Sequence, residues 1–207
     1  MPHVYTTFAH MRQDFKYSYP GDMYVIKPKE EENNSWICVR AFGSLENTIS
    51  YMREAHAQYF IPLDWKVWET RTGEKREGYR PVVTNFIFLR IGEEVKETLN
   101  MVTSCPYPVS VMRTPGTYQT AFISKREMYE FQTMCNPEYT KIYMEREQAE
   151  MKSGDEVVIK SGNFKGFTGK LVRVKKKYYL VKTAGELAIL LQVPRWQCEK
   201  MAAKKET

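Results

Sequence analysis

The chain has 207 residues, a net charge of +6, and a composition that is 43% hydrophobic and 14% aromatic. This is enough apolar material for one large or two smaller folded domains, and the many aromatic residues favour strands. No apolar run approaches the roughly 20 residues that span a bilayer, and residues 1–24 lack the basic and apolar segments of a secretory signal. We therefore expect a cytoplasmic protein without membrane contact.

Charge is unevenly distributed along the chain. Residues 152–207 hold 13 Lys and Arg against 5 Asp and Glu, a local balance of +8 that leaves −2 for the remainder. A basic C-terminal part beside a near-neutral larger part predicts two modules with different partners.

The first 34 residues form a separate extension in this interpretation. Residues 29–34 are a charged run without periodicity, which is typical of a partly flexible linker. The first domain is predicted to span residues 35–136. It opens with a strand at 36–41, followed by a helix that Ser44 caps and that buries Leu45, Ile49, Met52 and Ala55.

A second strand is predicted at residues 59–63 and continues to 68, and a charged hairpin tip is expected at 70–79. Residues 82–91 are almost continuously apolar, which predicts a central strand that is buried on both faces. The remaining predictions are a helix at 94–102, a strand at 109–112, and a helix that starts at Ser124. Ser124 and Glu127 have the spacing of a capping box. This order predicts an α+β fold, an antiparallel sheet flanked by helices.

Residues 137–151 are predicted to be an interdomain linker, and residues 202–207 a tail. Between them, residues 152–201 contain short β-branched runs separated by glycines and lysines, which predicts a small closed β-barrel. Gly162 and Gly166 suit a tight loop that requires positive φ. Phe164 and Phe167 flank Gly166, so one ring can pack the barrel while the other meets a partner.

The pattern Gly-Asp-x-Val-x-Ile at residues 154–159, followed by Gly-x-Phe-x-Gly-Phe-x-Gly at 162–169, resembles the KOW module. That module occurs in NusG-type transcription factors and in some ribosomal proteins. The opening strand at 36–42, the strand at 60–63 and the strand at 83–90 are similar, in this order, to the NusG N-terminal domain. The chain thus resembles the NusG family over residues 36–201. Its aromatic extension and divergent central strand look more like a specialised paralog of the RfaH or UpxY kind.

The resemblance implies an SH3-like KOW barrel and a monomer that promotes elongation or antitermination and carries out no chemistry. The N-terminal domain would bind the clamp of RNA polymerase and suppress pausing. The positions that match the polymerase-binding surface of the family are Arg40, Val83, Thr84, Phe86, Phe88 and Thr98. Two departures stand against the transfer, since residues 83–85 replace the Phe-Pro-Gly of the family and Arg40 lies on an apolar strand. Core packing explains each of these residues about as well.

The resemblance also implies that the barrel recruits a ribosomal protein or a termination factor. Phe164, Lys165 and Phe167 are the candidate contacts, and the lysines Lys175, Lys176 and Lys177 at a predicted hairpin suit contact with nucleic-acid phosphate. A solvated turn explains the three lysines better than such a contact does.

Two rival functions follow from the same sequence. A ribosome-associated or RNA-binding KOW protein accounts for the basic part but leaves the first 150 residues without a role. An enzyme is not expected: His3, His10 and His56 stand alone, and no nucleotide-binding glycine pattern occurs. The cysteines form no C-x-x-C pair, so we expect free thiols. We expect neither a metal site nor a cofactor. These cysteines are Cys38, Cys105, Cys135 and Cys198.

Overall fold

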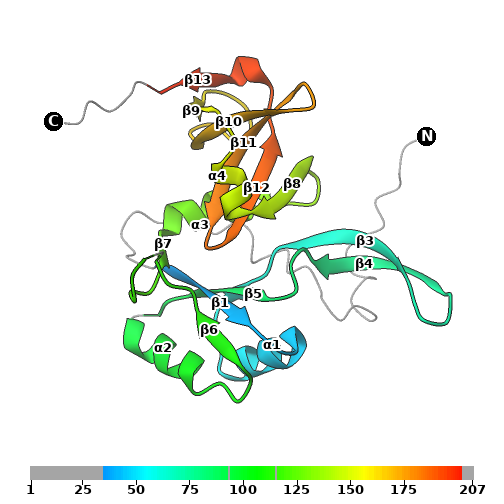
Figure 1. Cartoon of the computed structure of the whole chain (residues 1–207), viewed down its shortest axis with the longest axis vertical. Coiled ribbons are helices and arrows are strands. Elements are labelled where there is room, and N and C mark those ends of the chain that lie inside the picture. The colour runs from blue at the N-terminus through cyan, green and yellow to red at the C-terminus, as the bar shows by residue number, and fades with distance from the viewer. Residues whose placement is uncertain (1–34, 93, 115, 202–207) are drawn as a thin grey trace.

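The computed structural model describes residues 35–92, 94–114 and 116–201. The predicted extension at 1–34 and the tail at 202–207 lie outside the described residues. Two units are stacked on each other, an N-terminal unit and a C-terminal unit, and a long hairpin projects to one side of them (Figure 1).

The N-terminal unit is built on an antiparallel sheet in the order β2-β5-β1-β6, with β7 also paired to β1. Its strands are β1 (Trp36–Ala41), β2 (Tyr59–Phe60), β5 (Phe86–Arg90), β6 (Val109–Val111) and β7 (Phe122–Ile123). Its helices are α1 (Leu45–Glu54), α2 (Val95–Thr103) and α3 (Lys125–Met134). The predicted antiparallel sheet flanked by helices is therefore present.

Local sequence signals set where the helices begin. The Ser44 side chain accepts a hydrogen bond from the Asn47 backbone N–H, so it caps α1 as predicted. Ser124 and Glu127 form the predicted capping box at the start of α3, with each side chain satisfying a backbone N–H of the other residue.

The central strand is buried on both faces, as predicted, but it is shorter than predicted. Ile87, Phe88 and Leu89 are all fully buried in β5. The strand begins only at Phe86, and residues 82–85 bend. The bend is needed because the chain must turn from the projecting hairpin into the middle of the sheet.

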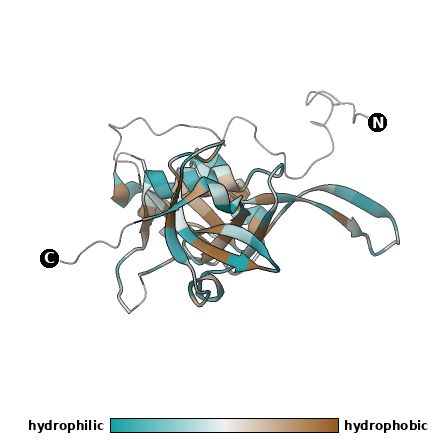
Figure 2. Ribbon diagram, turned by 90° about the horizontal axis from the view of Figure 1, so that it is seen from above, coloured by the Kyte–Doolittle hydropathy of each residue, from teal (hydrophilic) through white to brown (hydrophobic). Residues whose placement is uncertain are grey.

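That hairpin consists of β3 (Leu63–Glu69) and β4 (Lys75–Pro81), which pair only with each other. It extends away from both units (Figure 2). The predicted loop at 70–79 is shorter in the structure, because β4 already starts at Lys75. Cross-strand ring contacts stabilise the ribbon, which would otherwise be marginal as two isolated strands. Trp65 packs edge-to-face on Tyr79, and the Arg80 guanidinium lies 4.1 Å from the centre of the Trp68 ring.

The C-terminal unit is a curled six-stranded sheet in the order β13-β9-β10-β11-β12-β8, with all pairs antiparallel. Its strands are β8 (Lys141–Glu145), β9 (Asp155–Ile159), β10 (Thr168–Val174), β11 (Lys177–Ala184), β12 (Leu187–Gln192) and β13 (Cys198–Lys200). It also contains α4 (Arg146–Glu150) and the short 3₁₀ helix η2 (Arg195–Gln197).

The segment 137–151 is not the linker that the sequence predicted. Residues 141–145 form β8, which pairs with β12 along its whole length, and residues 146–150 form α4. Ile142 and Met144 pack against a buried cluster that includes Ala149 and Leu190. Pairing with β12 and these contacts make the segment an edge strand of the C-terminal sheet.

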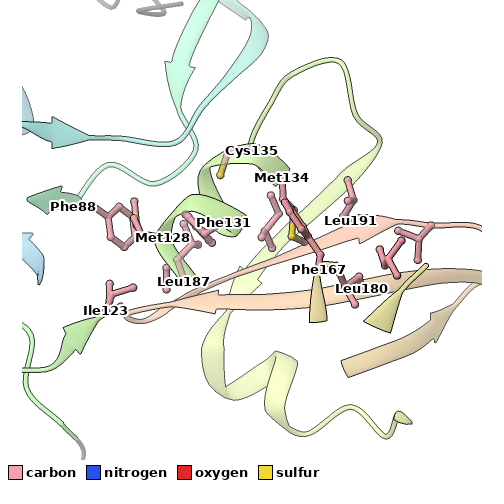
Figure 3. Close-up of a cluster of buried hydrophobic side chains, with 14 of the residues drawn as sticks. Phe88, Ile123, Met128, Phe131, Met134, Cys135, Phe167, Leu180, Leu187 and Leu191 are labelled. Atoms are coloured by element: carbon pink, nitrogen blue, oxygen red, sulfur yellow. The ribbon is translucent and has the colours of Figure 1, made fainter. Parts of the chain in front are cut away.

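One continuous core joins the two units. It runs from the N-terminal sheet, through α3, into the C-terminal sheet, and Figure 3 shows Phe88 and Ile123 at one end and Leu180 and Leu191 at the other. Phe131 of α3 lies between them. The two units therefore share buried apolar surface rather than meeting through polar contacts alone.

Candidate interaction surfaces

The two faces of the N-terminal sheet are covered differently. On one face, Ile37 and Val39 of β1 and Ile87 of β5 pack against α1 and α2. On the other face, Phe60 and Phe88 pack against α3, and the centre of the Phe131 ring lies 5.4 Å from that of Phe88 and 6.4 Å from that of Phe60. We call this second face, which also includes Cys38, the aromatic face.

The C-terminal unit also reaches the aromatic face. Gly185, in the turn between β11 and β12, has φ +57°, and a Cβ at this position would lie 2.9 Å from Cys38 Cβ and 3.8 Å from a Phe88 ring carbon. Only glycine fits such a close approach in this backbone conformation. Burial raises the pKa of the Cys38 thiol to about 12, and the negative charge of Glu186 adds to the rise. The β11–β12 turn is thus seated on the middle of the aromatic face.

Charged groups hold the same interface. Glu130 of α3, with a side chain only 3% exposed, forms an ion pair with Lys182 of β11. Its other oxygen accepts a hydrogen bond from Arg126 Nε at 3.1 Å, and Arg126 also donates to the Gly166 carbonyl at 3.3 Å. A buried carboxylate needs such partners, because an unpaired charge in an apolar setting is costly.

A second ion pair joins the C-terminal sheet to the base of the hairpin. Lys141 Nζ of β8 lies 3.7 Å from a carboxylate oxygen of Asp64, and it donates to the Asn136 carbonyl at 2.8 Å. Burial lowers the pKa of Lys141, while Asp64 opposes that shift. The strand that the sequence analysis expected to be a linker therefore contributes to the contact between the units.

The six predicted polymerase-binding residues do not form one exposed surface. Arg40 and Phe86 face each other across β1 and β5 at the rim of the aromatic face, where Arg40 is exposed and Phe86 half-buried. Thr84 is exposed and Val83 half-buried in the adjoining bend. Phe88 is fully buried beneath α3 and the β11–β12 turn.

Thr98 is separate from the other five. It lies on α2, which covers the opposite face of the sheet, and its hydroxyl oxygen accepts a hydrogen bond from the Gly92 N–H at 3.4 Å. The polymerase-binding role of all six residues remains a prediction.

The predicted partner residues of the KOW loop are mostly turned inward. The Phe164 ring packs on Tyr139 with ring centres 4.7 Å apart, and the buried Phe167 packs on Tyr129 of α3 at 6.1 Å. Lys165 is exposed. Phe167 therefore contributes to the contact between the units, Phe164 packs on the segment that connects them, and Lys165 is the one exposed side chain of the three. Gly162 and Gly166 have the predicted positive φ.

The predicted lysine hairpin is present. Lys175 and Lys176 form the turn between β10 and β11, both with positive φ, and Lys177 begins β11. All three side chains are exposed. Their contact with nucleic acid remains a prediction.

The exposed Trp196 in η2 was not among the predicted binding residues. This side chain is 78% exposed, although indole rings are usually well buried. A signal was available: Pro194, Arg195 and Trp196 directly follow the apolar run of β12, where a proline marks the end of the strand.

Within the described residues, no group of His, Cys, Asp and Glu side chains is placed to hold a metal ion. In the same part of the chain, no helix is both long and apolar enough to cross a bilayer.

Comparison with protein families adds one finding. The profile of the KOW motif matches residues 153–182, which cover β9, β10 and most of β11. The chain is therefore a KOW-containing protein, and this class includes both NusG-type factors and ribosomal or RNA-binding proteins. No curated protein matches the chain.

Proposed function

We propose that this chain is a transcription elongation or antitermination factor, of a specialised NusG-like kind. Its N-terminal unit would bind the clamp of RNA polymerase, and its C-terminal unit would bind a further partner. The observation that carries the proposal is the combination, in one chain, of a KOW motif with a preceding antiparallel sheet that has an apolar aromatic face.

In such a role the factor would catalyse nothing. It would stabilise the elongating state of the polymerase by its extra affinity for that state. The exposed rim of the aromatic face, formed by Arg40 and Thr84, is open to contact in the arrangement described. Contact through Phe88, in contrast, requires both α3 and the β11–β12 turn to move away. If only a minor fraction of the molecules is uncovered, the apparent affinity for polymerase equals the affinity of the uncovered form multiplied by that fraction.

The alternative function is a ribosome-associated or RNA-binding protein. The KOW motif fits it equally well, and the exposed lysines at 175–177 suit it. It does not use the aromatic face, so the two functions differ in which unit carries the binding.

The test is retention on immobilised core RNA polymerase, followed for the full chain and for Arg40→Glu. We expect retention of the wild type and a loss of about tenfold in Arg40→Glu, because a rim charge is reversed. The matched control is Arg53→Glu, another exposed arginine, on α1, which should bind like the wild type.

A second arm addresses the covered face. Lys182→Met removes a partner of the buried Glu130 and should loosen the C-terminal unit, so it should bind polymerase more tightly than the wild type. If neither the wild type nor Lys182→Met is retained, while the wild type binds ribosomes or free RNA, the proposal fails and the alternative stands.

A further inference from the structure

The C-terminal unit presents one large aromatic side chain that packing does not account for. Trp196 is 78% exposed, and it lies outside the part of the chain that matches the KOW motif. Its backbone is nevertheless firmly held. Gln197 N–H donates to the Pro194 carbonyl at 3.1 Å, the Lys160 N–H donates to the Gln197 carbonyl at 2.8 Å, and Arg195 Nη1 donates to the Cys198 carbonyl at 2.8 Å.

The loop between β9 and β10 lies directly against η2. A Cβ on Gly162 would lie 3.3 Å from the amide nitrogen of Gln197, so the loop and the 3₁₀ helix are in contact. The Lys165 N–H in turn donates to the Gly162 carbonyl at 3.2 Å. The exposed ring of Trp196 is therefore carried on a braced backbone next to a loop with an exposed lysine, and the exposed Arg195 precedes it.

The surroundings of Trp196 do not resemble an apolar protein-binding patch. The other large exposed apolar side chains in the described part of the C-terminal unit are Met151 and Met201. The Met201 N–H donates to the Glu156 carbonyl of β9, whereas η2 is bonded to Lys160, four residues further along the chain. Four residues of strand span about 13 Å, so the backbone of Met201 is separated from η2 by about that distance along β9. Protein hot spots cluster several buried anchors. Beside Trp196 lie instead the exposed Arg195 in the chain and the exposed Lys165 on the adjoining loop.

We propose that Trp196, with Lys165 and Arg195, forms a binding surface for single-stranded nucleic acid. A base stacks on the indole, and the two cations contact phosphates on either side of it. Unpaired bases expose faces that an aromatic ring can cover regardless of sequence, and the backbone supplies the negative charge. The basic balance of residues 152–207 favours a negatively charged partner, and the phosphates of a nucleic acid supply that charge.

This surface is independent of the proposed polymerase contact, because it lies on the other unit. Its success or failure is measured without polymerase. It also differs from the lysine hairpin at 175–177, which offers charge but belongs to another turn.

The test measures fluorescence anisotropy of a labelled, unstructured RNA of about 12 nucleotides with the full chain at roughly 50 mM salt. Trp196→Ala should weaken binding by about 5- to 140-fold, the range expected from loss of one stacked base. Trp196→Phe should restore most of the affinity. Trp65→Ala, a 39% exposed tryptophan on the hairpin, is the matched control and should bind like the wild type.

Salt dependence separates the ring from the cations. Lys165→Ala should reduce the slope of log affinity against log salt by about 0.7, the value for one phosphate contact on a single strand. Trp196→Ala should leave that slope unchanged. A single-stranded DNA of the same length tells whether the 2′-hydroxyl contributes, because either strand supplies a base to stack.

The proposal is overturned if Trp196→Ala binds RNA as well as the wild type does. It is equally overturned if a duplex binds as tightly as the single strand, because paired bases offer no free face. Unfolding curves for each variant check that the fold is kept. Trp196 is not buried, so we expect Trp196→Ala to fold like the wild type.

Discussion

Gly185 lies so close to Cys38 that a single added methyl group would bring two carbon atoms within 2.9 Å of each other. The two residues are far apart in sequence and belong to different units. Their contact is the point at which the C-terminal unit is seated on the aromatic face. Four predictions concern this interface and the core on either side of it.

We expect Gly185→Ala to destabilise the protein by about 2–4 kcal/mol, because it adds overpacking against Cys38 to the strain of a positive φ. Urea denaturation measures the change. Gly166→Ala is the matched control: its φ is also positive, but no atom lies within 4 Å of the added carbon. Equal losses in the two variants would show that the approach to Cys38 does not matter.

Lys182→Met should cost about 3 kcal/mol, because it leaves the buried carboxylate of Glu130 with Arg126 as its remaining charged partner. Lys160→Met, which removes the exposed ion pair with Glu199, should cost less than about 1 kcal/mol. The double variant Glu130→Met with Lys182→Met should be more stable than the sum of the single losses predicts. Additive losses would mean that the two side chains are not coupled.

Phe88→Ala should destabilise the protein by about 3–5 kcal/mol, because it opens a cavity between Phe60 and Phe131. Phe42→Ala should change the unfolding free energy by less than about 1 kcal/mol, since this ring is 62% exposed and lies under the Arg40 guanidinium. A loss of polymerase binding in Phe88→Ala would therefore report unfolding. For this reason the binding test uses Arg40 instead. A stability of Phe88→Ala close to that of the wild type would contradict the packing described.

Stability should fall as the pH rises above about 9, because burial raises the pKa of both Cys38 and Cys135 from 9.0 to about 12. The folded chain then holds these protons more tightly than the unfolded chain does. The stabilisation is complete below pH 9 and is lost between about 9 and 12.

Lysines and tyrosines titrate in the same pH window, so the measurement is a comparison of variants. Denaturation midpoints between about pH 8 and pH 11 should fall less for Cys135→Ala than for the wild type. Cys105→Ala, at a half-buried position, is the control. Parallel curves for all three proteins would show that the buried thiols do not contribute.

Short-range patterns made much of the fold predictable. The capping box at Ser124, the positive φ of Gly162 and Gly166, and the burial of β5 each follow from residues within a few positions of one another. Such signals act locally, and the structure agrees with them.

What was missed depends on contacts between distant residues. β8 is only weakly apolar, and it becomes a strand because β12, more than forty residues later, offers a free edge. Phe164 turns inward because it packs on Tyr139, and Phe167 turns inward because it packs on Tyr129. No periodicity in the sequence could indicate that the β11–β12 turn would meet Cys38.

The inclusion of β8 in the C-terminal sheet limits how far the two units could separate. With α3 ending at Met134 and β8 starting at Lys141, residues 135–140 are the connection that can change conformation without breaking a strand or a helix. Six fully extended residues reach about 20 Å. Withdrawal of the β11–β12 turn from Cys38 would therefore be a short displacement, limited by this connection, that keeps the C-terminal unit at high local concentration and leaves α3 over Phe88.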